Sequence, residues 1–419
     1  MIEVEKFCLE NGLRVVVHND PSTPIVSFNM LYDVGSKDED PCSTGFAHLF
    51  EHLMFGGSIN IPKFDEYLER TGGENNAFTN NDFTNYYITI PKENLETAFW
   101  LESDRMLSLA FSKKSLDVQK SVVLEEFNQR YLNQPYGDVW HLIRPLAYKV
   151  HPYRWPTIGI EPEHIKKATL NNVKEFFYNH YAPNNAILSI AGPVNTNEIL
   201  EYAKKWFGGI ERRPIPLRNL PKEPKQTEPK TLEVERNVPF DSIYKVYHMC
   251  NRKHSDFPAT DLISDLLSNG KSSRLYNKLV KERNILSDVN AYLTGDIDEG
   301  LFVITGRLYK TTSFEAAERA ISDELENLKH KPLDENELEK VKNKFESNFR
   351  FGEASPLDKA MNLSFYELIG KAEDVNLEVE NYRSVSAQDV KEVSSRVFAT
   401  DNCSTLYYKA KSANSSDSE

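Results

Sequence analysis

The sequence predicts an α+β protein built as two homologous lobes, each a mostly antiparallel sheet packed with helices, joined by a proline-rich linker. Its 419 residues, 40% of them hydrophobic, are too many for one ordinary core. Strands alternate with helices in the same order in each half of the chain. Between the halves, residues 212–239 hold six prolines and many charges, which is typical of an extended connector.

The first half begins its pattern with a strand-like segment, residues 25–36, and a helical segment, residues 45–55. Apolar residues then alternate over residues 86–90, as they do in a half-buried strand. A long amphipathic helix follows over residues 93–111.

The second half repeats this order over residues 242–250, 257–270, 289–308 and 313–328. Asn76-Ala77-Phe78 in the first half and Asn290-Ala291-Tyr292 in the second fall at corresponding places. A duplication explains the repeat, and chance similarity of short patterns is the alternative. The predicted organisation is an N-terminal lobe (1–211), a linker (212–239), a C-terminal lobe (240–410) and a disordered polar tail (411–419).

The charge balance excludes partners that are bound through a general positive field. Lys and Arg number 50 against 63 Asp and Glu, so the net charge is −13. A chain this acidic is a poor binder of nucleic acid or of an anionic bilayer. No apolar run approaches the roughly 18 residues of a spanning helix. We therefore expect neither a nucleic-acid nor a membrane partner.

Cysteine usage and the N-terminus point to the compartment. Cys8, Cys42, Cys250 and Cys403 are scattered without a CxxC pair, which suits a reducing compartment better than a disulfide scaffold. The N-terminus lacks a basic start followed by an apolar stretch, so no signal peptide is visible. We expect a cytoplasmic protein; a periplasmic location stays open if a leader has been removed.

The string GFAHLFEHLMFGG, residues 45–57, carries the chemistry. His48 and His52 are four residues apart, so on a helix both imidazoles lie on one face and can close on one zinc ion. Glu51 shares that side and is placed to hold a water as a general base. The alternative is a helix that carries two histidines by chance, but burying these groups among phenylalanines without a partner is costly.

A catalytic zinc needs a third protein ligand and an open position for water. The segment DVQKSVVLEEFNQR offers two carboxylates, Glu125 and Glu126. On a helix each lies on a stripe of mixed polarity, so periodicity does not choose between them. A solvated carboxylate pair is the structural alternative for both.

Several blocks together resemble the pitrilysin/insulinase metallopeptidases, the inverzincins. These blocks are HLFEH, EEFNQR, GGENNAFTNNDFTNYY, HPYRWPTIG, FYNHYAPNNAILSIAG and SSRLYNKL. The resemblance runs from about Phe7 to about Tyr408. It is greatest to the short, two-lobed bacterial members, which are similar to the mitochondrial processing peptidase subunits.

The resemblance implies one zinc per chain, with His48, His52 and Glu126 as ligands and Glu51 as the general base. It also implies that an extended peptide substrate lies along a sheet edge beside Asn76, Ala77 and Phe78. In that position the amide of Asn76 would hold a peptide carbonyl near the metal. A simple turn residue before the strand is the alternative for Asn76.

The sequence departs from the family pattern in two places. Seven residues before the third ligand, Gln119 replaces the usual glutamate, which removes a charge that supports the metal from outside its ligand set. In the second half, Lys281 and Asp288 stand where active members carry an arginine and a tyrosine. Aspartate cannot donate a hydrogen bond to an oxyanion at neutral pH. A misalignment by a residue or two is the alternative.

The expected function is that of a zinc endopeptidase that cleaves short or unfolded peptides in an enclosed chamber. Because Lys281 and Asp288 replace the arginine and tyrosine, we expect the chain to be the zinc-bearing subunit of a dimer. Its partner is either a homologous subunit that supplies the pair, in a heterodimer, or a second copy of the chain. The rival interpretation is a non-catalytic structural subunit of the same family.

Overall fold

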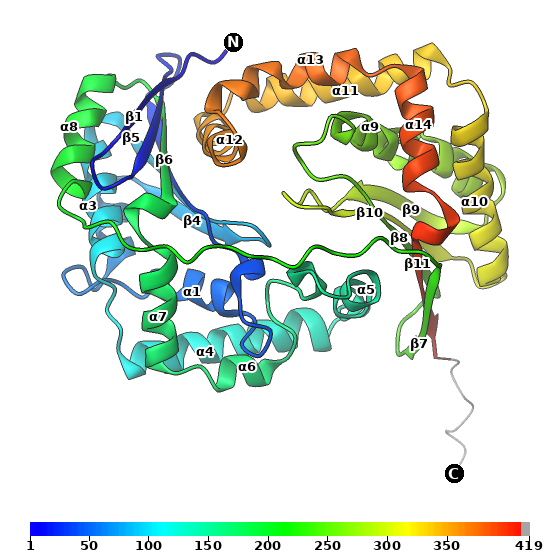
Figure 1. Ribbon diagram of the computed structural model, residues 1–419, viewed down its shortest axis with the longest axis horizontal. Helices are drawn as coiled ribbons and strands as arrows, with labels where there is room; N and C mark the ends of the chain where they lie inside the picture. Colours follow the sequence, from blue (N-terminus) through cyan, green and yellow to red (C-terminus); the bar gives the residue numbers. More distant parts are fainter. Residues whose placement is uncertain (412–419) are drawn as a thin grey trace. The chain divides into compact units, whose positions relative to one another are not determined.

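The computed structural model describes residues 1–411; the predicted tail lies outside the described residues, apart from Lys411. The chain forms two compact units, here called unit 1 and unit 2 (Figure 1). Unit 1 consists of Met1–Gln129, Trp155–Pro221 and Asn348–Glu378. Unit 2 consists of Arg130–Arg154, Lys222–Ser347 and the chain from Val379 onward. Each combines one sheet with helices, which confirms the predicted fold class.

Unit 1 contains a six-stranded sheet in the order β1-β2-β6-β3-β5-β4. Its strands are β1 (Glu5–Cys8), β2 (Arg14–Asn19), β3 (Ile25–Tyr32), β4 (Glu74–Thr79), β5 (Thr84–Pro91) and β6 (Ala186–Gly192). Strands β2 and β6 pair in parallel, and the other neighbours are antiparallel. Strand β4 ends this order, so one of its backbone edges has no neighbouring strand in the sheet.

Helices cover both faces of this sheet, as the strand alternation of β3 requires. Phe28 points to one face and meets Phe99 of α3 (Leu95–Leu107), with ring centroids 5.1 Å apart. Asn29 points to the other face, where its amide donates to the hydroxyl of Ser364 of α12 (Pro356–Ile369) at 2.8 Å. The remaining helices of unit 1 are α1 (Phe46–Met54), α2 (Phe64–Arg70), α4 (Lys113–Phe127), α6 (Pro162–Lys166), α7 (Leu170–His180) and α8 (Thr196–Phe207).

Unit 2 repeats the sheet of unit 1 without its first strand. The order is β7-β11-β8-β10-β9, with β7 (Lys230–Arg236), β8 (Ser242–His248), β9 (Leu286–Leu293), β10 (Leu301–Leu308) and β11 (Cys403–Ala410). Strands β7 and β11 pair in parallel, as β2 and β6 do, and the other neighbours are antiparallel. The same order with the same directions supports the duplication that the sequence pattern indicates.

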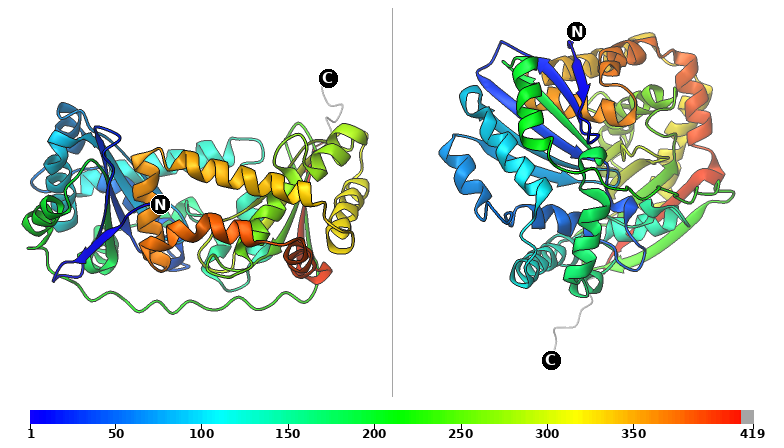
Figure 2. Two further views of the ribbon diagram at one scale, coloured as in Figure 1. Left: turned by 90° about the horizontal axis from the view of Figure 1, so that it is seen from above. Right: turned by 60° about the vertical axis from the view of Figure 1, so that its left-hand side comes forward.

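The helices of unit 2 again lie on both faces of the sheet (Figure 2). One core holds residues of α9 (Phe257–Ser268), α10 (Phe314–His330) and α14 (Ala387–Val397). A second core, on the other face, is formed by α5 (Val139–Ala147) with Val246, Val303 and Leu406 of the strands. Two further helices, α11 (Glu335–Gly352) and α13 (Glu378–Ser384), span the boundaries between the units.

The units are discontinuous, whereas the sequence pattern predicted contiguous lobes over residues 1–211 and 240–410. Each half of the chain contributes one helix to the sheet of the other half: α12 packs in unit 1 and α5 in unit 2. A buried ion pair between Lys359 of α12 and Asp20 fixes the first of these. Pairings between residues so distant in sequence leave no local signal, so a boundary drawn from composition misses them.

The segment predicted as a linker also differs from an extended, solvated connector. Residues 230–236 form β7, where Leu232 and Val234 alternate with charged residues on an edge strand. Before it, Arg218 donates to the carboxylates of Asp33 and Asp38 in unit 1. Within unit 2, Glu223 accepts the N–H groups of residues 149–151. The proline-rich segment is therefore held to the folded units by side chains such as Arg218 and Glu223.

No helix among residues 1–411 combines the length and the apolar character that crossing a bilayer requires.

Candidate active site

Helix α1 presents one apolar face and one polar face. Its buried residues are Phe46, Ala47, Leu49, Phe50, Leu53 and Met54. Phe50 lies in an aromatic cluster, with ring centroids 4.4 Å from Tyr181 and 5.9 Å from Phe177. On the opposite side, His48, Glu51 and His52 are only half-buried. Packing of the apolar face therefore fixes the direction in which the three polar side chains point.

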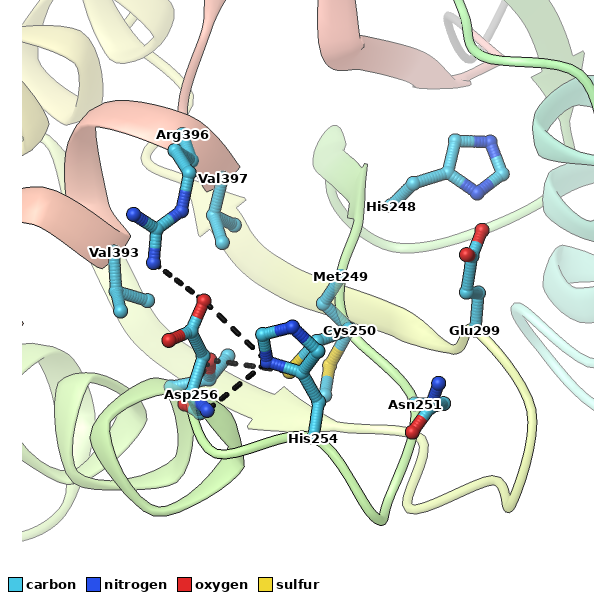
Figure 3. A pocket seen from close by; sticks show the side chains of 11 residues that line it. His248, Met249, Cys250, Asn251, His254, Asp256, Glu299, Val393, Arg396 and Val397 are labelled. Atoms are coloured by element: carbon cyan, nitrogen blue, oxygen red, sulfur yellow. Dashed lines mark hydrogen bonds and ion pairs between the residues drawn. The ribbon is translucent and has the colours of Figure 1, made fainter.

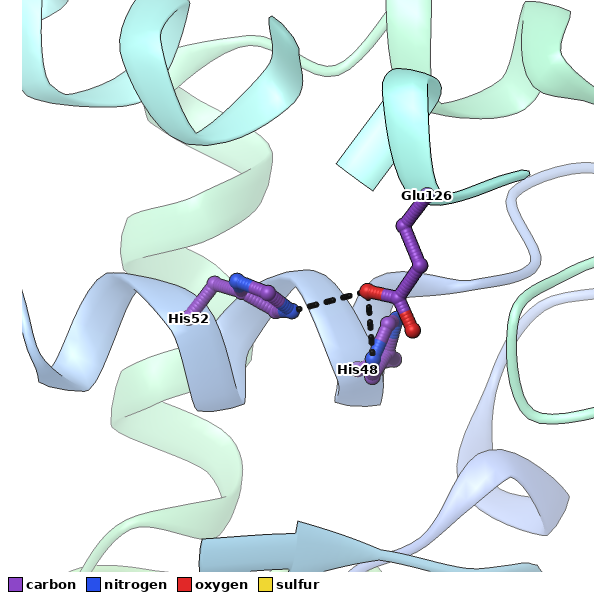
Figure 4. A group of neighbouring side chains, drawn as sticks. All are labelled: His48, His52 and Glu126. Carbon is purple, nitrogen blue, oxygen red and sulfur yellow. Dashed lines mark ion pairs between the residues drawn. The ribbon is translucent and has the colours of Figure 1, made fainter. Parts of the chain in front are cut away.

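The two imidazoles of α1 converge with a carboxylate from α4 (Figure 4). The Nε2 atom of His52 lies 3.4 Å from Oε2 of Glu126, and Nε2 of His48 lies 3.7 Å from the same oxygen. The imidazole rings are nearly perpendicular, with centroids 4.8 Å apart. Within residues 1–411 these three side chains form the one group of three or more His, Cys, Asp or Glu whose ligand atoms all lie within 4.8 Å of one another.

This donor set fits a zinc ion. With metal–ligand bonds of about 2.0–2.2 Å, the ligand atoms of a tetrahedral site are about 3.4 Å apart. The two measured nitrogen–oxygen separations are close to that value. Two neutral imidazoles and one carboxylate are ligands that zinc accepts in catalytic sites, with the fourth position left for water.

Of the two neighbouring carboxylates that periodicity does not distinguish, the structure brings Glu126 together with the histidines. Glu125 is exposed and accepts a hydrogen bond from the amide of Gln129, one turn further along, at 2.8 Å. Gln119 is half-buried on the same helix, two turns before Glu126. Buried Val123 and Phe127 of α4 orient the helix so that Glu126 lies on the side facing α1.

Glu51 is held by a residue that sequence reasoning missed, Thr79 at the end of β4. The hydroxyl of Thr79 donates to Oε2 of Glu51 at 2.6 Å. Burial raises the pKa of the Glu51 carboxyl and the nearby Glu126 carboxylate adds to the shift, while the hydrogen bond from Thr79 opposes it. A carboxyl that is fixed in orientation beside two imidazoles is placed to exchange a proton with a group bound between them.

Strand alternation divides the predicted substrate residues between the two faces of β4. Ala77 shares a face with Thr79, the side on which α1 lies. The side chains of Asn76 and Phe78 point to the opposite face, where the ring of Phe78 meets Phe83. The carbonyl oxygen of the Asn76 amide accepts the N–H of Ala77 at 2.8 Å. Asn76 is therefore engaged with its own strand and is not brought together with Glu51.

The C-terminal end of α1 meets a buried arginine. Arg105 of α3 is 2% exposed and pairs with Glu102 one turn away. Its guanidinium donates to the carbonyl of Met54, the last residue of α1, at 3.5 Å. A cation at this end complements the helix dipole. The sequence shows Arg105 only as one of several charged residues of an amphipathic helix and does not indicate its contact with α1.

The second departure from the family pattern lies in unit 2. Lys281 is exposed and belongs to a π-helical segment that ends at Glu282. Asp288 lies on β9, with a carboxylate oxygen 3.6 Å from Nη1 of Arg307 on β10. Neither residue offers the planar donor pair of an arginine or the hydroxyl of a tyrosine.

Two units of like topology, one of which carries an HxxEH helix converging with a distant glutamate, are the arrangement of inverted-motif zinc metallopeptidases. Comparison with known proteins agrees. The chain belongs to peptidase family M16, the insulinase family: the insulinase (peptidase family M16) model matches residues 14–148, and the peptidase M16 inactive domain matches residues 167–345.

The relatives include bacterial and mitochondrial proteins. The chain is 30% identical to the zinc protease PqqE of Helicobacter pylori, over 97% of this chain and 92% of that protein. A crystal structure of a protease from Helicobacter pylori superposes with a TM-score of 0.93 at 30% identity, covering 98% of this chain and 100% of the other. The mitochondrial-processing peptidase subunit beta of Saccharomyces cerevisiae is 26% identical over 50% of this chain and 46% of that subunit.

Proposed function

We propose that the chain is a zinc-dependent endopeptidase, with the metal held by His48, His52 and Glu126 of unit 1. The observation that carries the proposal is the convergence of these three side chains beside Glu51. A zinc ion bound there would polarise the scissile carbonyl and lower the pKa of its water. Membership of a family whose relatives are named zinc proteases supports the same function.

In this proposal Glu51 is the general base. Its position on the polar face of α1, with the two histidines, would put it beside a water bound to the metal. The hydroxyl of Thr79 holds one carboxylate oxygen of Glu51 and leaves the other to accept the proton. The same carboxyl can then return the proton to the leaving amine.

The substrate would bind in extended form along the free edge of β4. This edge strand offers main-chain groups to a peptide, so that affinity comes from the backbone and allows many sequences. The N–H of Ala77 is covered by the amide of Asn76, which must turn aside before a peptide carbonyl can take its place. Ala77 contributes its backbone and small size, Asn76 lies beside it, and Phe78 offers an aromatic ring to substrate side chains on the opposite face.

The partner and the enclosed chamber belong to the same proposal. Lys281 and Asp288 supply neither a guanidinium fork nor a phenolic hydroxyl, so we infer that a homologous subunit supplies the arginine and tyrosine. A dimer of two-lobed chains would enclose the site and admit short or unfolded peptides. The alternative partner is a second copy of this chain.

Restoring the missing pair tests this function directly. We expect the zinc-loaded wild-type chain to cleave a quenched fluorescent peptide mixture slowly, and the Lys281→Arg/Asp288→Tyr variant to cleave it at least about tenfold faster, since one oxyanion donor is worth about 10²–10³ in kcat. A zinc chelator should abolish both rates. Loss of the exposed ion pair between Asp288 and Arg307 costs little stability.

The matched control is Lys281→Arg/Asp288→Phe, which adds the same ring without the hydroxyl and should cleave no faster than the wild-type chain. An equal gain in both variants, or a rate that persists in chelator, would count against the proposal. A wild-type chain that is already fast would show that no partner is needed.

The replacement of both residues also favours the rival function, a non-catalytic subunit of the same family. Zinc content separates the two functions. A catalytic chain should purify with close to one zinc per chain, whereas a structural subunit has no need to retain the metal.

A further inference from the structure

The first turn of α1 has backbone groups that its own sequence leaves without a cap. The N–H groups at the start of a helix have no partner within the helix, and a Ser, Thr, Asp or Asn at the N-cap usually supplies one. Here the N-cap is Gly45, which has a left-handed φ of +87° and makes no side-chain cap. A Cβ atom at Gly45 would lie 2.6 Å from the carbonyl oxygen of Ile158, so no capping side chain fits.

A carboxylate from outside the helix fills this role. Oε2 of Glu39 accepts the N–H of Gly45 at 2.9 Å, and Oε1 accepts the N–H of Ala47 at 2.8 Å. Glu39 is 7% exposed. Burial raises the pKa of its carboxyl to about 8, against the opposing effect of these two hydrogen bonds. Burying an acid is costly unless hydrogen bonds compensate, and the N–H groups of Gly45 and Ala47 supply two of them.

We propose that Glu39 is a positioning residue for the metal centre, which holds the first turn of α1 so that His48 stays aligned with His52 and Glu126. Ala47, whose N–H it binds, immediately precedes His48. The ionised form of the carboxyl, which these two N–H donors favour, also complements the positive end of the helix dipole. This inference rests on the proposed zinc site.

The segment that carries Glu39 is itself fixed to the turn after β4. The N–H groups of Ser36 and Lys37 donate to the carbonyls of Asn80 and Asn81, at 3.1 and 2.9 Å. The side chains of Lys37 and Asp82 form a buried ion pair at 2.7 Å. One buried segment therefore sets the start of α1, with His48, and the end of β4, with the threonine that holds Glu51.

Substituting Glu39 by glutamine tests the role with little change of shape. Glutamine keeps one acceptor oxygen but turns an NH₂ group toward the other N–H, so one hydrogen bond and the ionisable group are lost. We expect about a tenfold or greater loss of zinc affinity, measured by competition with a chromophoric chelator, as for other residues that support metal ligands. Glu39→Asp keeps a carboxyl group and should recover part of the affinity.

Asn11→Ala is the matched control. Asn11 is also a buried polar residue of unit 1 that holds a helix end: its amide donates to the carbonyl of Phe207, the last residue of α8, and to that of Ile210. It should lower the melting temperature and leave the zinc affinity within about twofold.

The outcomes separate the inference from the function on which it rests. Equal zinc affinities in Glu39→Gln and Asn11→Ala would overturn the positioning role while leaving the zinc site intact. Failure of both Glu39 variants to fold would also overturn it, since the carboxylate would then serve folding alone. A wild-type chain that binds no zinc would overturn the proposed function first.

Discussion

Replacing Glu51 by glutamine should lower kcat for peptide hydrolysis by about three orders of magnitude and leave zinc bound. General bases contribute about 10²–10⁴ to such rates, and an amide cannot accept the proton of the attacking water. The amide oxygen can still accept the hydrogen bond from Thr79, so the local structure should persist. The rates are measured in whichever background cleaves faster, wild-type or Lys281→Arg/Asp288→Tyr, after loading with one equivalent of zinc.

Glu125→Gln is the control for this experiment, because it removes a carboxylate of the same charge from the exposed side of α4. It should retain the full rate. Retained hydrolysis by a zinc-loaded Glu51→Gln variant would refute the assignment of Glu51 as the base.

Replacing Glu126 by glutamine should lower the affinity for zinc by more than about a hundredfold, beyond the loss caused by removing a residue that only supports a ligand. Glutamine would remove the negative charge of the proposed third ligand and leave two imidazoles to hold the ion. Competition with a chelator of known affinity measures the effect at a fixed pH, because metal binding is linked to proton release.

The adjacent Glu125→Gln again supplies the control, since it changes the net charge of the chain by the same amount. Its zinc affinity should match that of the wild-type chain. If the two glutamine variants bound zinc equally, the third ligand would lie elsewhere and the geometry of α4 would have no bearing on the metal.

The parts of the site that local sequence could predict are those within one helix. The spacing of His48, Glu51 and His52 sets their common face once α1 forms. The helix covers Phe46–Met54, within the predicted range of residues 45–55. Glu126 lies on another helix, and its stripe is mixed in polarity, so only the family resemblance distinguished it from Glu125. For Asn76, the alternation of side chains along a strand already indicates its orientation: residues 76 and 79 point to opposite faces of β4.

The parts that could not be predicted depend on pairings distant in sequence. Thr79 and Glu39 form hydrogen bonds to α1. No periodicity of the sequence relates either residue to its partner in the helix. The exchange of α5 and α12 between the two sheets has the same origin. Strand β7 lies in the segment whose composition predicts a solvated linker. Its apolar residues alternate with charged ones, as suits an edge strand, so the strand pattern is weak.

The zinc centre is tested most directly by X-ray absorption at the zinc K edge of the purified wild-type chain. We expect close to one zinc per chain, coordinated by two imidazole nitrogens at about 2.0–2.1 Å and by oxygen at about 2.0–2.2 Å, without sulfur. A zinc–sulfur distance of about 2.3 Å, or a chain that retains no zinc, would contradict a centre built from His48, His52 and Glu126.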